Sequence, residues 1–144
     1  MIVVDVNLLL YAYDGRATPH ERARLWWQST ISGPELIGLP WQTIHGFLRI
    51  STDTRISGNQ VSMESSLALV ERWMNLSSVR VLTPGERHWS ILRRMLLEGQ
   101  ARGPMVTDAQ LAALTIEYGG VLHTTDRDFA RFPGLRWVNP LQES

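Results

Sequence analysis

Cysteine and lysine are both absent from this chain of 144 residues, and no apolar run is long enough to suggest a membrane span. The lack of cysteine excludes a disulfide framework, a thiol nucleophile and any zinc or iron–sulfur centre held by cysteine. The lack of lysine excludes every mechanism that needs a lysine side chain. The histidines show none of the close spacing of zinc motifs: His20, His45, His88 and His123.

An excess of charge of either sign is also missing, because 14 arginines balance 14 acidic residues. Bulk charge therefore gives no support for nucleic-acid binding, although guanidinium groups suit bidentate contacts with phosphate. A compositional bias of the source genome explains the exclusive use of arginine without any function. The sequence starts with neither a basic segment nor a long apolar stretch, so we expect no secretion signal and a cytoplasmic protein.

The length and the apolar fraction of 44% suit a single compact domain over residues 1–144. Short apolar runs alternate with amphipathic segments, as in sheets whose parallel strands are joined by helices. We therefore predict a three-layer α/β/α sandwich with a central, mainly parallel sheet. The predicted strands are 2–4, 35–39, 79–82, 121–123 and 135–138. The predicted helices are 18–31, 41–50, 61–76, 83–96 and 107–118, with a helical turn at 126–132 and a tight turn at 58–59.

Three of the predicted helices begin with a capping signature, in which a threonine is followed three residues later by glutamate or glutamine. The expected N-caps are Thr18, Thr83 and Thr107.

Four of the six aspartates lie where a predicted strand ends or a helix begins. Asp5 follows the first apolar run, Asp108 opens a helical pattern, and Asp126 and Asp128 follow a later strand. The carboxyl ends of parallel strands share one edge of a sheet, so we expect these side chains to meet there. Carboxylates so gathered repel one another unless a cation holds them, and oxygen ligands suit Mg²⁺ or Mn²⁺.

Each aspartate also has an explanation in folding alone. Asp108 and Asp126 could cap helices, since negative charge at a helix N-terminus stabilises by about 0.3–1 kcal/mol. Asp5 is harder to explain in this way, because the residue three positions on is Leu8, which offers no capping partner. The joint pattern therefore weighs more than any single aspartate.

Polar residues beside these aspartates are candidates to orient them from outside the ligand set. Asn7 could position Asp5 or a water molecule, and an ordinary turn role fits it equally well. Thr107, Thr124 and Thr125 could supply hydroxyl groups, with an N-cap role favoured for Thr107. We select Asn7, Thr107 and Thr125 as the supporting residues.

Three segments in this order resemble the PIN-domain ribonucleases, above all the VapC-type toxins of bacterial toxin–antitoxin pairs. They are Val4–Tyr11, Thr107–Leu114 and Thr124–Phe129. The similarity extends to Leu39–Trp41, Gly46–Arg49 and Phe132–Leu135, so it spans nearly the whole chain. Each motif is short, but together they make the assignment fairly specific.

The resemblance implies a Mg²⁺- or Mn²⁺-dependent endoribonuclease toxin that cleaves structured cellular RNA of the tRNA or rRNA class. It implies that Asp5, Asp108 and Asp126 bind the metal and that Asp128 joins them in catalysis. It also implies a small cognate antitoxin, a homodimer contact and no membrane partner.

Arginines near the cleft would then hold the RNA backbone, with Arg49 and Arg127 as the leading candidates. A solvated surface role fits both arginines as well. The six tryptophans could stack on bases, but their helical spacing favours core packing for most of them.

One position departs from the family pattern. The family carries a glutamate three residues before the arginine that stands here at position 49, and this chain has Gly46 instead. His45 is a weak substitute, and Glu117 or Asp128 could compensate from another element. The departure puts a second metal ion in doubt.

Three rival functions remain. A phosphatase with Asp5 as nucleophile is disfavoured, because the haloacid-dehalogenase pattern needs a second aspartate where Asn7 stands and a lysine that this chain lacks. A dinucleotide-binding enzyme is disfavoured by the lack of a G-x-G-x-x-G motif after the first strand. The other rival is a degenerate PIN domain that binds an antitoxin or RNA without cutting it.

Overall fold

The computed structural model describes residues 1–56 and 61–142, and in this part of the chain the short apolar runs form one five-stranded sheet. Every strand pairs in parallel with its neighbours, in the order β3-β2-β1-β4-β5. This confirms the predicted parallel sheet. The strands are β1 (Ile2–Val4), β2 (Ile37–Pro40), β3 (Val79–Leu82), β4 (Val121–His123) and β5 (Trp137–Val138).

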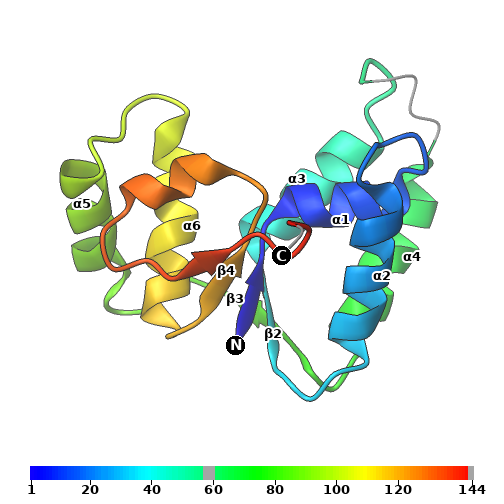
Figure 1. Cartoon of the computed structure of the whole chain (residues 1–144), viewed down its shortest axis with the longest axis horizontal. Helices are drawn as coiled ribbons and strands as arrows, with labels where there is room; N and C mark the ends of the chain where they lie inside the picture. The colour runs from blue at the N-terminus through cyan, green and yellow to red at the C-terminus, as the bar shows by residue number, and fades with distance from the viewer. Residues whose placement is uncertain (57–60, 143–144) are drawn as a thin grey trace.

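Helices cover both faces of the sheet, which confirms the three-layer α/β/α architecture. Figure 1 shows the sheet between two groups of helices. One group is α1 (Val6–Tyr13), α2 (His20–Ile31), α3 (Trp41–Ser51) and α4 (Met63–Met74). The other is α5 (His88–Glu98), α6 (Met105–Glu117) and the short 3-10 helix η1 (Arg127–Arg131).

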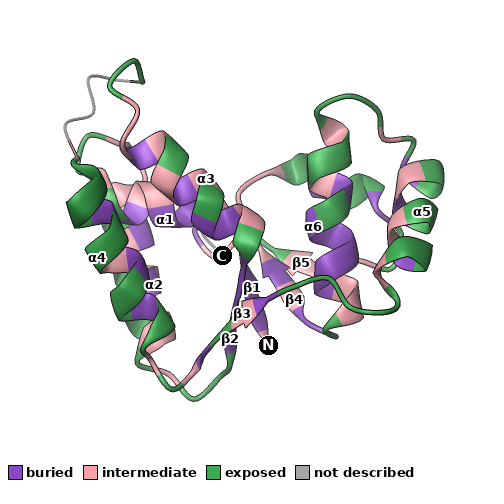
Figure 2. Ribbon diagram, turned by 180° about the vertical axis from the view of Figure 1, so that it is seen from behind, coloured by how far each residue is buried: buried purple, intermediate pink, exposed green. Residues whose placement is uncertain are grey.

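The strands serve two hydrophobic cores because successive side chains point to opposite faces of a sheet. Ile2 and Val4 of β1 lie in the core under α1–α4, whereas Val3 between them lies in the core under α5 and α6. Figure 2 shows buried residues on the strands and on the helix sides that face them. Burial on both faces explains why β1 and β2 are continuous apolar runs rather than alternating ones.

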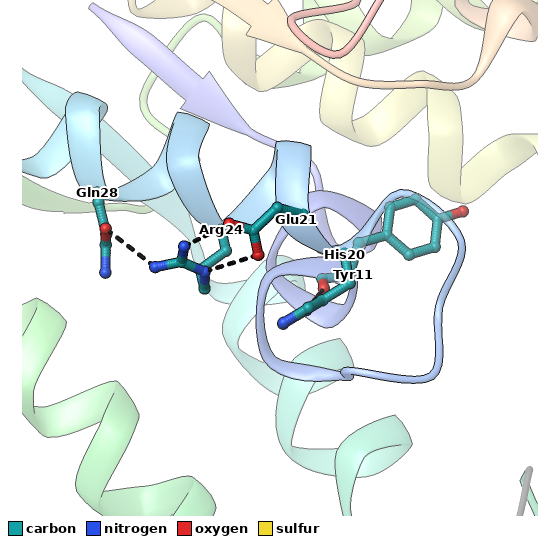
Figure 3. Close-up of polar contacts among 5 residues, drawn as sticks. All are labelled: Tyr11, His20, Glu21, Arg24 and Gln28. Carbon is teal, nitrogen blue, oxygen red and sulfur yellow. Dashed lines mark hydrogen bonds and ion pairs between the residues drawn. The ribbon is translucent and has the colours of Figure 1, made fainter.

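The start of α2 differs from its predicted capping box. The helix begins at His20, and the residue before it is Pro19, so Thr18 is not the N-cap. The Glu21 carboxylate pairs with the Arg24 guanidinium one turn later instead of reaching back (Figure 3). The His20 ring lies against the C-terminal turn of α1, with Nδ1 2.8 Å from the carbonyl oxygen of Tyr11.

The other two predicted caps are also wrong. The helix predicted from Thr83 begins at His88, and the helix predicted from Thr107 begins at Met105, after Pro104. A further miss is α1, whose eight residues were not assigned to any element. The capping signals predicted at the three threonines are therefore not used.

Most remaining boundaries agree within two residues. The strands at 2–4, 79–82 and 121–123 and the helix from Trp41 are confirmed, while the helix predicted over 61–76 is α4, capped by the Ser62 hydroxyl. Gly119, with φ of +65°, ends α6 as expected, because a left-handed conformation favours glycine. The predicted turn at 58–59 lies outside the described residues. Among the described residues, no helix has the length and apolar character needed to cross a bilayer.

Candidate active site

Asp5 occupies the junction between β1 and α1, at the edge of the sheet where the parallel strands end. The residue is buried, with a relative exposure of 9%. Its Oδ1 accepts a hydrogen bond from the backbone N–H of Val6 at 2.8 Å, and its Oδ2 accepts one from the Thr124 hydroxyl at 2.7 Å. Asp5 therefore does cap a helix, and the expectation that it has no capping partner is wrong.

Thr124 connects two of the predicted acidic residues. It is completely buried directly after β4, and its Oγ1, besides donating to Asp5, accepts the backbone N–H of Asp126 at 3.0 Å. Asp126 in turn caps η1 by accepting the N–H of Asp128 at 2.9 Å. Thr125 was the threonine predicted to support the acidic residues, but the hydroxyl that links Asp5 to Asp126 belongs to Thr124. Its position directly after a predicted strand was the signal.

Asp108 reaches the same edge from the first turn of α6. Because α6 begins at Met105, Thr107 is a residue of the first turn and not the N-cap that was predicted. The Thr107 carbonyl oxygen accepts a hydrogen bond from Nε2 of Gln42 at 3.3 Å, which ties the N-terminus of α6 to that of α3. Two helix N-termini and the β1–α1 junction thus meet at one edge of the sheet.

The charges of the other three aspartates all act on Asp108. The pKa of Asp108 is raised from 3.8 to about 6, first by burial and then by the charges of Asp126, Asp5 and Asp128. Arg131 opposes this rise and is the weakest of the influences. Asp5 and Asp108, which are 103 positions apart in the sequence, therefore interact electrostatically.

Burial also raises the pKa of Asp5. The hydrogen bonds from Thr124 and Val6 oppose this effect, and the charge of Asp126 adds to it. Buried negative charge of this kind is costly unless a cation or several donors compensate it.

The donor chemistry of this edge fits a hard divalent cation, but no complete ligand set is formed in advance. In residues 1–56 and 61–142, no three histidine or acidic side chains gather closely enough to hold a metal ion. Within the same residues, no arginine forms an ion pair with Asp5, Asp108, Asp126 or Asp128. Oxygen-only donors with uncompensated negative charge are what Mg²⁺ and Mn²⁺ prefer.

Gly46 lies beside this edge, so the missing acidic residue would have faced the site. A Cβ atom at Gly46 would lie 3.3 Å from Cγ2 of Val6, the residue after Asp5. His45 does not take its place, because its exposed ring packs against Trp41 with the ring centroids 5.7 Å apart.

Glu117 cannot compensate either. Its carboxylate lies at the other end of α6, where it accepts the backbone N–H groups of Gly85 and Arg87 at 2.9 and 3.1 Å. This excludes one of the two residues that were expected to replace the missing glutamate.

The two arginines expected to bind RNA are both exposed. Arg127 lies between Asp126 and Asp128 in the chain, and Arg49 lies two turns after the start of α3. Sequence reasoning did not single out Arg131, whose charge acts on Asp108. Its place three residues after Asp128 in the predicted helical turn could have indicated it.

Comparison with known proteins assigns the family. The model of the PIN domain matches residues 2–135. The chain is 41% identical to Ribonuclease VapC33 of Mycobacterium tuberculosis over 143 residues, which cover 99% of this chain and all of that protein. It is 33% identical to Ribonuclease VapC37 of the same species, over 97% of each chain.

Solved structures share the fold at much lower identity. One is VapC20 of Mycobacterium tuberculosis, a toxin described as cleaving the sarcin-ricin loop, with a TM-score of 0.67, 18% identity and coverage of 94% of this chain and 99% of that one. Another is a DNA-bound VapBC complex from Salmonella typhimurium, with a TM-score of 0.65, 20% identity and coverage of 96% and 97%.

Proposed function

The chain belongs to the PIN-domain family and to its VapC ribonucleases, and we propose that it is a divalent-metal-dependent endoribonuclease toxin. The observation that carries the proposal is the shared field of Asp5, Asp108, Asp126 and Asp128 at one edge of the sheet. The proposed substrate is structured cellular RNA of the tRNA or rRNA class. VapC20, which is similar in fold, is described as a toxin that cleaves the sarcin-ricin loop, and this supports the choice.

Asp5, Asp108 and Asp126 would hold Mg²⁺ or Mn²⁺, and Asp128 would complete the acidic group. When bound, the ion lowers the pKa of water and stabilises negative charge on phosphoryl oxygens. Asp5 is fixed for this task by its hydrogen bonds from Val6 and Thr124.

Other residues of the chain would bind and orient the substrate. Asn7, Thr107 and Thr125 lie next to the acidic residues in the sequence and would orient ligands or water. Arg49 and Arg127 are exposed and would contact RNA phosphates, for which the guanidinium group is suited.

We also propose a small antitoxin as partner and a homodimer as the working state. The support comes from relatives in fold, several of which are toxin–antitoxin complexes, such as VapBC2 from Rickettsia felis bound to a promoter fragment. A short reading frame next to this gene that encodes a DNA-binding protein would agree with the proposal.

The test is Mn²⁺ binding by calorimetry together with cleavage of total RNA by the purified chain freed of any partner. The wild type should bind the ion and cut RNA, and Asp5→Asn should lose both. Asp53→Asn is the matched control, because Asp53 forms an exposed ion pair with Arg55. A wild type that binds no ion and cuts no RNA would rule the proposal out, and sequencing of cut ends would identify the target.

The second candidate is a PIN domain that binds an antitoxin or RNA without cleavage. Gly46 at the usual acidic position favours it, as does the lack of a preformed ligand set among residues 1–56 and 61–142. Gly46→Glu distinguishes the two: if the missing acid limits catalysis, this variant gains Mn²⁺ affinity and activity. Val6 must shift by a few tenths of an ångström to admit the new side chain.

A further inference from the structure

An exposed stripe of three residues runs along the outer side of α3. Trp41, His45 and Arg49 are spaced four residues apart, so they lie on one face of the helix, and all three are exposed. The Trp41 side chain is 40% exposed, and its ring lies 5.7 Å from that of His45 at an interplanar angle of 36°. The opposite side of α3 carries the buried residues, among them Ile44 and Phe47.

The stripe begins at the rim of the acidic group. Trp41 directly follows β2, whose end lies at the same edge of the sheet as Asp5. Its neighbour Gln42 is hydrogen-bonded to the carbonyl oxygen of Thr107, the residue before Asp108. Gly46, in the adjacent row, faces Val6. The Gln42 contact therefore holds the Trp41 end of the stripe beside the N-terminus of α6, and Arg49 lies two turns further along α3.

RNA binding to this protein needs a source of affinity other than overall charge. The chain has a formal net charge of zero, and the four carboxylates repel a phosphate backbone. Base stacking on aromatic side chains supplies affinity that does not depend on charge, and it is available to any unpaired base.

We propose that Trp41, His45 and Arg49 form an RNA-binding ridge that places single-stranded RNA against the acidic group. An unpaired base stacks on the Trp41 indole, which His45 supports from the side, and the Arg49 guanidinium binds a backbone phosphate. The proposal rests on the ribonuclease function above and adds the substrate contacts of the same site.

A second exposed pair provides a matched control. Trp89 of α5 is 68% exposed, and the exposed Arg93 follows it one turn later. The N-terminus of α5 is fixed to the far end of α6, where Arg87 contacts Glu117. This pair has the same chemistry as Trp41 and Arg49 but lies away from Asp108.

The experiment measures binding of a labelled single-stranded RNA of mixed sequence by fluorescence anisotropy. EDTA is present, so cleavage does not interfere and the result does not depend on catalysis. Trp41→Ala should weaken binding about 5- to 150-fold, the loss expected for one base–aromatic stack. Trp41→Phe should retain most of the affinity. A plot of log binding constant against log salt concentration has a negative slope. Arg49→Ala should make this slope less steep by about 0.7, as expected for the loss of one phosphate contact.

Trp89→Ala and Arg93→Ala should change neither the affinity nor the salt slope. The proposal is overturned if Trp41→Ala binds RNA as tightly as the wild type, or if Trp89→Ala weakens binding equally. It is also overturned if Trp41→Ala keeps RNA affinity but loses a co-expressed antitoxin, which would make the stripe a protein-docking surface. A wild type that binds RNA through the ridge but never cleaves it would refute only the catalytic function.

Discussion

The two ends of α6 carry acidic residues in opposite circumstances. Asp108 at the N-terminal end faces three other carboxylates, and its pKa is raised to about 6. Glu117, about 13–14 Å further along the axis, accepts two backbone N–H groups, and its own carbonyl oxygen accepts the Arg87 guanidinium. Within the described residues, the Asp108 carboxylate accepts no comparable hydrogen bond and forms no ion pair.

The difference separates a functional carboxylate from a structural one. A satisfied carboxylate stabilises the fold, whereas carboxylates that raise one another's pKa destabilise it and persist where a site needs them. Neutralising Asp108 should therefore reduce activity and raise stability, whereas neutralising Glu117 should leave activity unchanged and lower stability.

The largest expected effect is on RNA cleavage. Asp108→Asn should reduce the cleavage rate more than about 100-fold, since loss of a metal ligand exceeds the 10–100-fold cost of losing an outer-shell partner. Glu117→Gln should leave the rate within about threefold of the wild type. Both rates are measured on the same RNA in Mg²⁺. Equal loss in the two variants would abolish the distinction between the two ends.

A residue outside α6 sharpens the comparison. Thr124→Val removes the hydroxyl that donates to Asp5 and accepts from Asp126, and it should cost about 10–100-fold in Mn²⁺ affinity or cleavage. Thr124→Ser keeps the hydroxyl and should recover most of both. Calorimetry and cleavage assays measure the two quantities. If Thr124→Val matches the wild type, the hydroxyl has no positioning role.

The next effect is on stability at the other end of the helix. Glu117→Ala should lower the free energy of unfolding by about 1–2 kcal/mol, because the N–H groups of Gly85 and Arg87 lose a charged acceptor but remain accessible to water. Urea denaturation measures this loss. Mn²⁺ affinity serves as the control and should not change. A fall in metal affinity would place Glu117 in the site after all.

The smallest effect has the opposite sign and depends on pH. The folded-state pKa of Asp108 lies above its ordinary value of 3.8, so ionisation costs stability as pH rises from about 4 to 6, and the full cost remains above 6. In EDTA, Asp108→Asn should therefore be about 1 kcal/mol more stable than the wild type at pH 7, after allowance for solvent screening. The difference should vanish near pH 4.

Thermal unfolding of both proteins across this pH range measures the effect. Mg²⁺ should raise the Tm of the wild type at pH 7 and have less effect on Asp108→Asn. The prediction is wrong if the wild type becomes more stable relative to Asp108→Asn as the pH rises.

Local signals in the sequence succeeded for strands and failed for helix starts. Ile2–Val4 was predicted to the residue, because an apolar run of this length that is buried on both faces is typical of a parallel strand. Val79–Leu82 was also predicted to the residue, although its Arg80 is exposed. The capping signature at Thr83 failed because a distant side chain fixes the turn before α5, and the one at Thr107 failed because the helix begins directly after a nearby proline. Glu117 binds the turn before α5, and Pro104 sets the start of α6 two residues before Thr107.

The amino-acid sequence by itself determined the parallel α/β architecture and the placement of aspartates at strand ends and a helix start. Periodicity and chain order are local properties, and the shared edge of a parallel sheet follows from them. Only the tertiary structure decided that Thr124 rather than Thr125 holds Asp5, that Gln42 joins α3 to α6, and that Glu117 is structural. These pairings depend on how packed helices and strands align in space, and residues 119 positions apart leave no local trace of their contact.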